Sequence, residues 1–124
     1  MNSIVFLSLN SAFGNIFSPE LDTVYYVENN VNVSWNKEAF SGLNTVNIFL
    51  LHNDFISEYH NGTDILNRNI LNTGYYNWIP EYDLNKYIYN DAGFKVLISS
   101  NNEPFSTTIG ESITNLFSNN FILR

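Results

Sequence analysis

The side chains that could do chemistry in this sequence are mainly aromatic rings and amides. The 124 residues include 10 Phe, 8 Tyr, 2 Trp and 22 Asn, whereas only 14% of residues are charged. Four tyrosines, Tyr75, Tyr82, Tyr87 and Tyr89, lie close to Pro80 in the sequence. Exposed aromatic clusters typically mark contact surfaces. We therefore predict that these four tyrosines contact a glycan or a protein partner.

The two tryptophans allow two interpretations, sugar stacking or burial. Trp35 ends the segment Val-Asn-Val-Ser-Trp, and Trp78 follows Tyr76 at a spacing of two, so both alternate with polar neighbours. Side chains that alternate in this way lie on one face of a strand, and the cores of β-sandwiches often contain such a Trp. We favour burial, and predict one shared core made of Trp35, Val46, Ile48, Trp78, Val96, Ile98 and Phe121.

A possible metal-binding group is formed by His52, Asp54, His60 and Asp64, which fall in one hairpin-like segment. A metal site needs three or four converging ligands, and this spacing matches no ligand rule. We therefore interpret the four residues as polar residues of a turn and a strand face, and predict no metal site.

Three acidic residues, Asp83, Asp91 and Glu103, are candidates for acid–base chemistry. Glycoside hydrolysis would need two carboxylates facing each other across a cleft, about 5–10 Å apart. We expect these three to be solvated, as isolated surface carboxylates usually are. The sequence contains no Gly-x-Ser-x-Gly motif, no phosphate-binding loop and no Cys, so we predict no catalytic residue and no cofactor.

The charge balance narrows the class of partner. The formal net charge is −7 with only five Lys and Arg, which argues against binding to nucleic acid or to anionic membranes. No stretch of 18 apolar residues occurs, so no membrane-spanning segment is predicted. Two N-glycosylation sequons, at Asn32 and Asn61, would be usable if the chain is exported.

The elements that must position these residues are short strands. Apolar residues recur at every second position in residues 31–35, 46–51 and 94–99, and turn-forming residues separate such runs. This pattern is typical of an all-β fold, and we predict a single β-sandwich domain over residues 15–124, immunoglobulin-like or fibronectin-III-like, with seven to nine strands in two sheets. Only residues 80–89 offer a helical turn.

Residues 1–14 precede the predicted domain. Residues 4–9 are mostly apolar, and Ala12 and Gly14 fit a signal-peptidase site, although no Lys or Arg precedes the apolar run. Two interpretations stay open, a signal peptide of residues 1–14 or a strand or tail of a cytoplasmic protein. We favour the signal peptide, with a mature chain that begins at Asn15.

An ordered set of segments resembles a known family. The set comprises Ile-Phe-Ser-Pro (16–19), Val-Asn-Val-Ser-Trp (31–35), residues 46–51, Asn-Thr-Gly-Tyr-Tyr-Asn-Trp-Ile-Pro (72–80), residues 94–100 and residues 117–123. It is similar to the N-terminal domain of fungal cell-wall synthesis proteins of the killer-toxin-resistance type, also found in Ser/Thr-rich GPI-anchored wall proteins. The resemblance spans residues 15–123. It implies a secreted, non-catalytic immunoglobulin-type β-sandwich.

The chain also departs from that family. The family's proteins usually carry a Ser/Thr-rich tail, which we do not expect in this chain, and Asn29-Asn30 replaces the Gly that usually precedes the first Trp strand. From the resemblance we expect a non-catalytic, secreted glycoprotein module of a cell wall or spore surface. It would bind wall polysaccharides such as β-glucan, or wall proteins. Two alternatives remain, a protein–protein adhesion domain that pairs through edge strands and a polysaccharide-processing enzyme.

Overall fold

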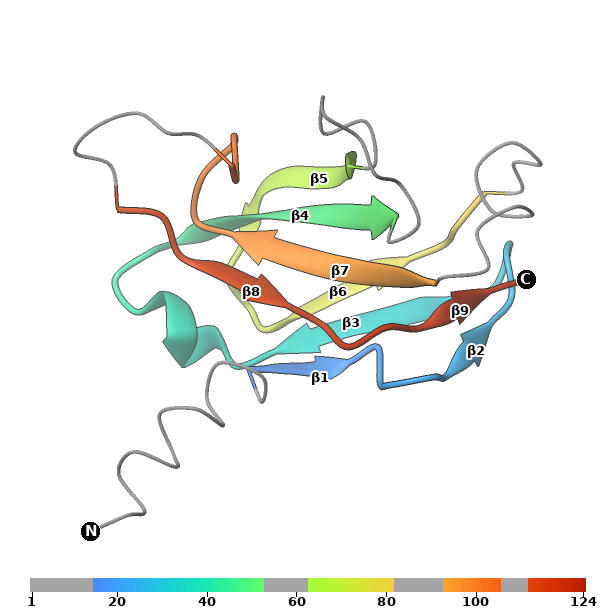
Figure 1. The fold of residues 1–124 in the computed structure, drawn as a ribbon. Coiled ribbons are helices and arrows are strands. Elements are labelled where there is room, and N and C mark those ends of the chain that lie inside the picture. Colours follow the sequence, from blue (N-terminus) through green and yellow to red (C-terminus); the bar gives the residue numbers. More distant parts are fainter. Residues whose placement is uncertain (1–14, 53–62, 82–92, 106–111) are drawn as a thin grey trace, which may run out of the picture.

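The computed structural model describes residues 15–52, 63–81, 93–105 and 112–124, and its strands are predominantly antiparallel. These ranges hold nine strands and one short 3-10 helix (Figure 1). In chain order they are β1 (Ile16–Ser18), β2 (Val24–Tyr25), β3 (Val31–Trp35), the helix η1 (Lys37–Phe40), β4 (Thr45–His52), β5 (Thr63–Leu71), β6 (Tyr75–Trp78), β7 (Phe94–Ser99), β8 (Asn115–Phe117) and β9 (Ile122–Leu123). The all-β prediction is confirmed.

The first sheet has three strands in the order β1-β3-β6, all antiparallel to their neighbours. Asn32 lies opposite Asn77, and Ser34 lies opposite Tyr75. Since successive side chains of a strand point to opposite faces, these four residues share the face that points away from the core. Val31, Val33 and Trp35 point the other way and are buried.

The second sheet has four strands in the order β5-β4-β7-β8, again antiparallel. Its two central strands are buried on both faces. Val46, Ile48 and Leu50 point into the core shared with the first sheet, whereas Phe49 and Leu97 are buried on the opposite face. The sequence pattern of alternation predicted only the first of these two faces.

A parallel pair of short strands, β2 and β9, closes one side of the molecule. Val24 lies opposite Ile122, and Tyr25 lies opposite Leu123. The N–H of Arg124 donates to the carbonyl of Tyr25 at 2.9 Å, and the N–H of Val27 donates to the carbonyl of Arg124 at 3.0 Å. The C-terminal residues are thereby held against the first third of the chain (Figure 1).

The core lies between the three-stranded and the four-stranded sheet. All seven residues that the sequence analysis placed there are buried in one cluster. The ring of Phe121 lies at its centre, edge-on to Tyr25 at 5.8 Å and to Trp78 at 6.4 Å between ring centroids. Such T-shaped contacts add about 0.5–1.5 kcal/mol each beyond area burial. The predicted core is confirmed.

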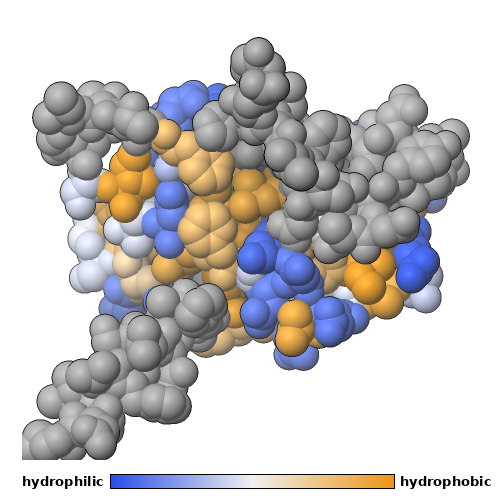
Figure 2. All heavy atoms as spheres, viewed as in Figure 1, coloured by the Kyte–Doolittle hydropathy of each residue, from blue (hydrophilic) through white to orange (hydrophobic). Residues whose placement is uncertain are grey.

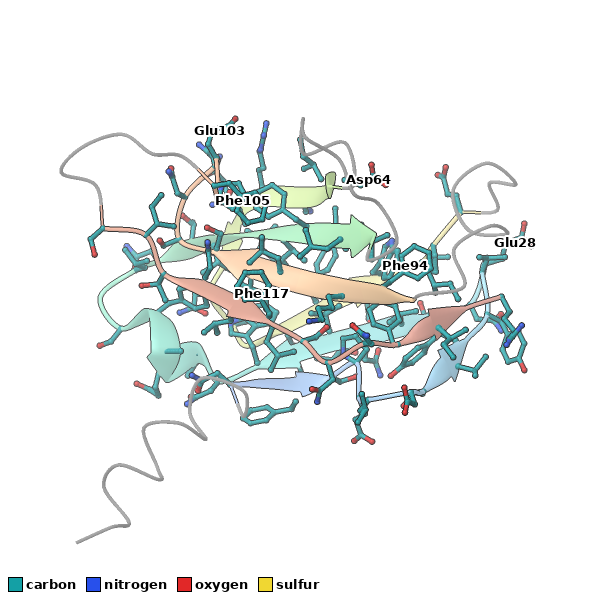
Figure 3. The ribbon with its side chains drawn as sticks, in the orientation of Figure 1. Glu28, Asp64, Phe94, Glu103, Phe105 and Phe117 are labelled. Carbon is teal, nitrogen blue, oxygen red and sulfur yellow. The ribbon has the colours of Figure 1, made fainter. Side chains whose placement is uncertain are left out.

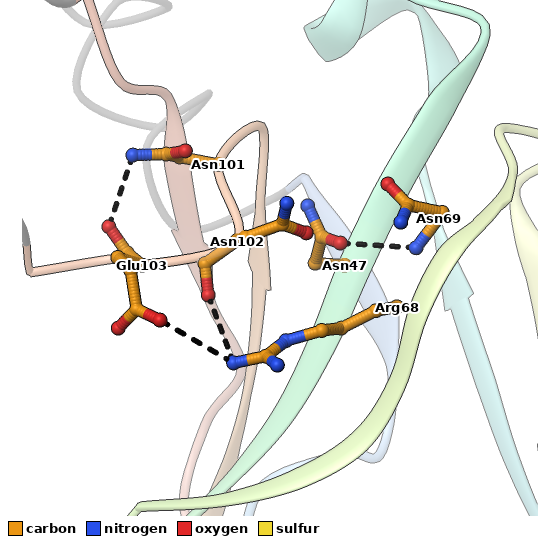
Figure 4. A network of polar contacts seen from close by, with 6 residues as sticks. All are labelled: Asn47, Arg68, Asn69, Asn101, Asn102 and Glu103. Carbon is orange, nitrogen blue, oxygen red and sulfur yellow. Dashed lines mark hydrogen bonds and ion pairs between the residues drawn. The ribbon is translucent and has the colours of Figure 1, made fainter.

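The segment after β7 folds back over the outer face of the four-stranded sheet. Arg68 of β5 holds this segment, since its Nη2 lies 3.5 Å from the carboxylate of Glu103 and donates to the carbonyl of Asn102 at 3.4 Å (Figure 4). Beneath it the buried Asn47 donates to the carbonyl of Ser99 and accepts from the N–H of Asn69. This cover, together with its two hydrogen bonds, explains why the polar side chain of Asn47 is buried there.

The elements that the sequence analysis missed include β2, β5 and the helix η1. β5 contains Asn67, Arg68 and Asn69, which break the alternation, and Asn69 has a φ of 54°. Its pairing with β4 shifts register twice. Where a strand bulges, side chains no longer alternate strictly between its two faces, so the period-two pattern that predicts strands is absent from this sequence. The helix η1 is a single turn capped by Asn36, whose side chain accepts from the N–H of Glu38.

Candidate functional site

The candidate site is the outer face of the three-stranded sheet, and we call it the amide–aromatic face. Its members come from three strands and leave their polar groups and rings toward solvent: Phe17, Asn32, Ser34, Tyr75 and Asn77. Asn32, Tyr75 and Asn77 are exposed, and Ser34 is half-buried. Strand pairing, rather than sequence proximity, brings them together.

Two aromatic rings flank the amides on this face. Tyr75 on β6 is 49% exposed and Phe17 on β1 is 57% exposed. β3 lies between them, so the two rings stand about two strand spacings apart, roughly 10 Å. Phe17 was not singled out by the sequence analysis, because its exposure depends on Ile16 facing the core.

The hydroxyl of Tyr75 is held between two amides. It lies 3.0 Å from Oδ1 of Asn32 and 2.8 Å from Oδ1 of Asn77. A hydroxyl carries one hydrogen, so it donates to only one of the two oxygens at a time. The other amide oxygen is then able to accept a hydrogen bond from a ligand hydroxyl.

Side-chain hydrogen bonds also hold the backbone around the face. The hydroxyl of Ser18 donates to the carbonyl of Asn32 at 2.7 Å, and the hydroxyl of Thr73 donates to the carbonyl of Tyr75 at 3.1 Å. Below the sheet, Trp35 donates through Nε1 to Oδ1 of Asn72 at 2.8 Å. The face is therefore a fixed surface whose side chains need little ordering when a ligand binds.

The other tyrosines of the sequence prediction, Tyr82, Tyr87 and Tyr89, lie outside the described residues, as does the sequon at Asn61. Asn32, the other sequon, lies on the amide–aromatic face itself. The prediction that Trp35 and Trp78 belong to the core rather than to a sugar-binding surface is confirmed by their burial.

The predicted acidic and metal-binding groups fall mostly outside the described residues. Asp54, His60, Asp83 and Asp91 are among the residues not described, and His52 ends β4. Glu103 is exposed and forms the ion pair with Arg68. In the described ranges, no three His, Asp or Glu residues come close enough together to hold a metal ion.

A concave feature lies at one end of the sheets, apart from the amide–aromatic face. It is an open cavity of about 370 Å³, with Ser41 and Leu43 on one side and Ser100, Asn101 and residues 112–114 on the other. None of these lining residues is a carboxylic acid, a His, a Lys or a Cys. Among the described residues, the lining therefore supplies no general acid or base.

An exposed apolar patch covers part of the outer face of the four-stranded sheet. Figure 2 shows apolar side chains gathered over the middle of this sheet, and in Figure 3 Phe117 is labelled over β7 and β8, with Phe105 labelled over β4. Phe117 lies opposite Leu97, which lies opposite Phe49, and that residue lies opposite Ile65. These pairs form one apolar row across the sheet.

Comparison with known proteins gave no match to any family model, to any curated protein or to any solved structure. Across the described ranges, no helix has both the length and the hydropathy needed to cross a bilayer.

Proposed function

We propose that this chain is a secreted, non-catalytic module of a cell wall or cell surface that binds polysaccharide through the amide–aromatic face. The fold would be a β-sandwich of the fibronectin-III or immunoglobulin type. The strand order supports this, since β1-β3-β6 faces β5-β4-β7-β8 and the short β2 joins the last strand in parallel. The resemblance of residues 15–123 to fungal wall proteins points in the same direction.

The observation that carries the proposal is the exposed ring of Tyr75, whose hydroxyl is held by Asn32 and Asn77. A fixed ring offers an apolar surface for a sugar face at little entropic cost, and the neighbouring amides offer hydrogen bonds to its hydroxyls. Neutral amides and hydroxyls suit an uncharged polymer. The net charge of −7 disfavours an anionic one.

The strength of one such contact follows from the exposed area. A Tyr side chain offers roughly 200 Å², and Tyr75 is 49% exposed. If a sugar covers half of what is exposed, about 50 Å² is buried, which is worth about 1.3 kcal/mol at about 25 cal/mol per Å². That is close to a tenfold change in affinity. Useful retention on a wall then requires contacts repeated along a polymer.

The test is retention of the unglycosylated chain, made in bacteria, on insoluble β-glucan and on chitin. We expect the parent to be retained and Tyr75→Ala to lose about tenfold in apparent affinity. The matched control is Tyr26→Ala, since Tyr26 is also exposed, at 56%, but lies away from Tyr75. Its neighbour Glu28 donates through its N–H to the carbonyl of Pro80, which follows the end of β6 opposite to Tyr75. Failure of the parent to bind either polymer, or equal loss in both variants, would refute the proposal.

A second candidate function is adhesion through an edge strand. β5 is nine residues long, and among the described strands only β4 pairs with it. Its side chains Ile65 and Leu71 are exposed. Unpaired strand edges accept a strand from another chain. A stable dimer in size-exclusion chromatography that is lost in Ile65→Lys, together with no retention on glycan, would favour this candidate over the first.

A further inference from the structure

Asn32 has two roles: it is a hydrogen-bond partner of Tyr75, and it is the acceptor residue of the sequon Asn32-Val33-Ser34. β3 is the middle strand of its sheet, so Asn32 lies between the strand that carries Phe17 and the strand that carries Tyr75. A sugar attached there would start in the middle of the amide–aromatic face.

The atom that N-glycosylation modifies, Nδ2 of Asn32, is accessible. Oδ1 of Asn32 faces the Tyr75 hydroxyl, and among the described residues Nδ2 of Asn32 has no hydrogen-bond partner. Its side chain is exposed, and Ser34, two residues on, lies on the same face. The side chains of Val31 and Val33 point into the core instead, so a glycan on Asn32 leaves the packing between the sheets unchanged.

We propose that Asn32 is an N-glycosylation site whose glycan covers Tyr75, so that the amide–aromatic face carries either its own sugar or an outside polysaccharide. This inference rests on the proposed function, because it concerns regulation of the same face. In the step, Nδ2 of Asn32 bonds to the anomeric carbon of a lipid-diphosphate-linked oligosaccharide. The bond from that carbon to the diphosphate oxygen breaks, the lipid diphosphate leaves with the electron pair, and the amide loses one proton.

The position of the first sugar follows from a single distance. The Tyr75 hydroxyl lies 3.0 Å from Oδ1 of Asn32, and Nδ2 is bonded to the same carbon as that oxygen. A sugar on Nδ2 is thus attached beside a half-exposed aromatic ring. Stacking on this ring removes the surface that an outside sugar would use.

The test compares two preparations of the full chain. One is made in bacteria, without glycosylation, and the other is exported from a eukaryotic host behind an established secretion signal. Occupancy of Asn32 is read as a mass increment on its peptide. Whether the glycan covers the ring is measured by the nitration of Tyr75 with tetranitromethane, which cover should reduce. Tyr26 is the internal reference because its exposure of 56% is similar.

We expect Asn32 to be occupied, nitration of Tyr75 to fall at least fivefold in the glycosylated form, and nitration of Tyr26 to stay equal. Retention on β-glucan or chitin should fall at least tenfold in the glycosylated form. An exported, folded chain without sugar on Asn32 would overturn the inference, and so would unchanged nitration of Tyr75 in an occupied chain.

Two variants separate the sequon from the surface. Ser34→Ala removes the sequon and keeps Asn32, so Tyr75 from the eukaryotic host should be nitrated as in the bacterial protein, whereas Ser34→Thr should restore occupancy and protection. The direct effect of Ser34→Ala on binding is measured in the bacterial preparation. If the unglycosylated parent binds no polysaccharide, the proposed function fails, and the nitration result alone decides the inference.

Discussion

Replacement of Gly93 by Ala tests how the last strand is joined to the rest of the fold. Gly93 has a φ of 89°, and a Cβ built on it would lie 2.9 Å from the backbone carbonyl oxygen of Phe121. That oxygen accepts from the N–H of Phe94 at 2.8 Å, and the N–H of Phe121 donates back to Phe94 at 2.9 Å. The extra methyl group therefore pushes apart a two-bond bridge that seats Phe121 in the core.

The size of the effect can be worked out by comparison with Gly42→Ala. Gly42 has a φ of 86°, but an added Cβ would meet nothing within 4 Å. A positive φ costs an L-residue about 1–2 kcal/mol, and the stiffer unfolded chain returns about 0.4–1 kcal/mol. We expect Gly42→Ala to lower the free energy of unfolding by about 1 kcal/mol. Gly93→Ala adds two weakened hydrogen bonds, about 0.5–1.5 kcal/mol each, for a total of about 2–4 kcal/mol.

The assay is urea unfolding followed by tryptophan fluorescence, because Trp35 and Trp78 are both buried and report on the core. The midpoint should fall further for Gly93→Ala than for Gly42→Ala at an unchanged slope. If the two variants lose the same free energy within about 0.5 kcal/mol, the close approach of Phe121 to Gly93 does not constrain the fold and the reasoning is refuted.

Two further predictions concern the tryptophans of the core, and a third concerns the N-terminus. Trp78→Ala should cost about 3–5 kcal/mol in urea unfolding, and a variant that melts with the parent would show that the ring is not part of the core. Trp35→Phe keeps an apolar ring but leaves Oδ1 of Asn72 without its donor, so we expect a loss of about 1–3 kcal/mol, reduced in a background with Asn72→Leu. Export from a eukaryotic host behind the chain's own N-terminus should yield a protein that begins at Asn15, as N-terminal sequencing would show; recovery of Met1 from the cytosol would contradict it.

The burial pattern shows where sequence reasoning reaches its limit. Alternation in residues 31–35 correctly assigned Val31, Val33 and Trp35 to one face, because side-chain direction in a strand is a local property with a period of two. The same rule predicted one buried face for β4. It did not anticipate the burial of Asn47 and Phe49, because this burial depends on partners far away in the sequence: Asn47 donates to the carbonyl of Ser99, 52 residues later, and Phe49 lies opposite Leu97.

The candidate site was predictable only in its parts. The sequence by itself determined the all-β class, the shared core and the exposure of Tyr75, because each depends on local patterning and composition. Only the tertiary structure decided that Asn32 lies beside Tyr75, 43 residues further along the chain, with Phe17 on the neighbouring strand. Strand order and register depend on long-range pairing and on the fit of the core, which no local pattern encodes.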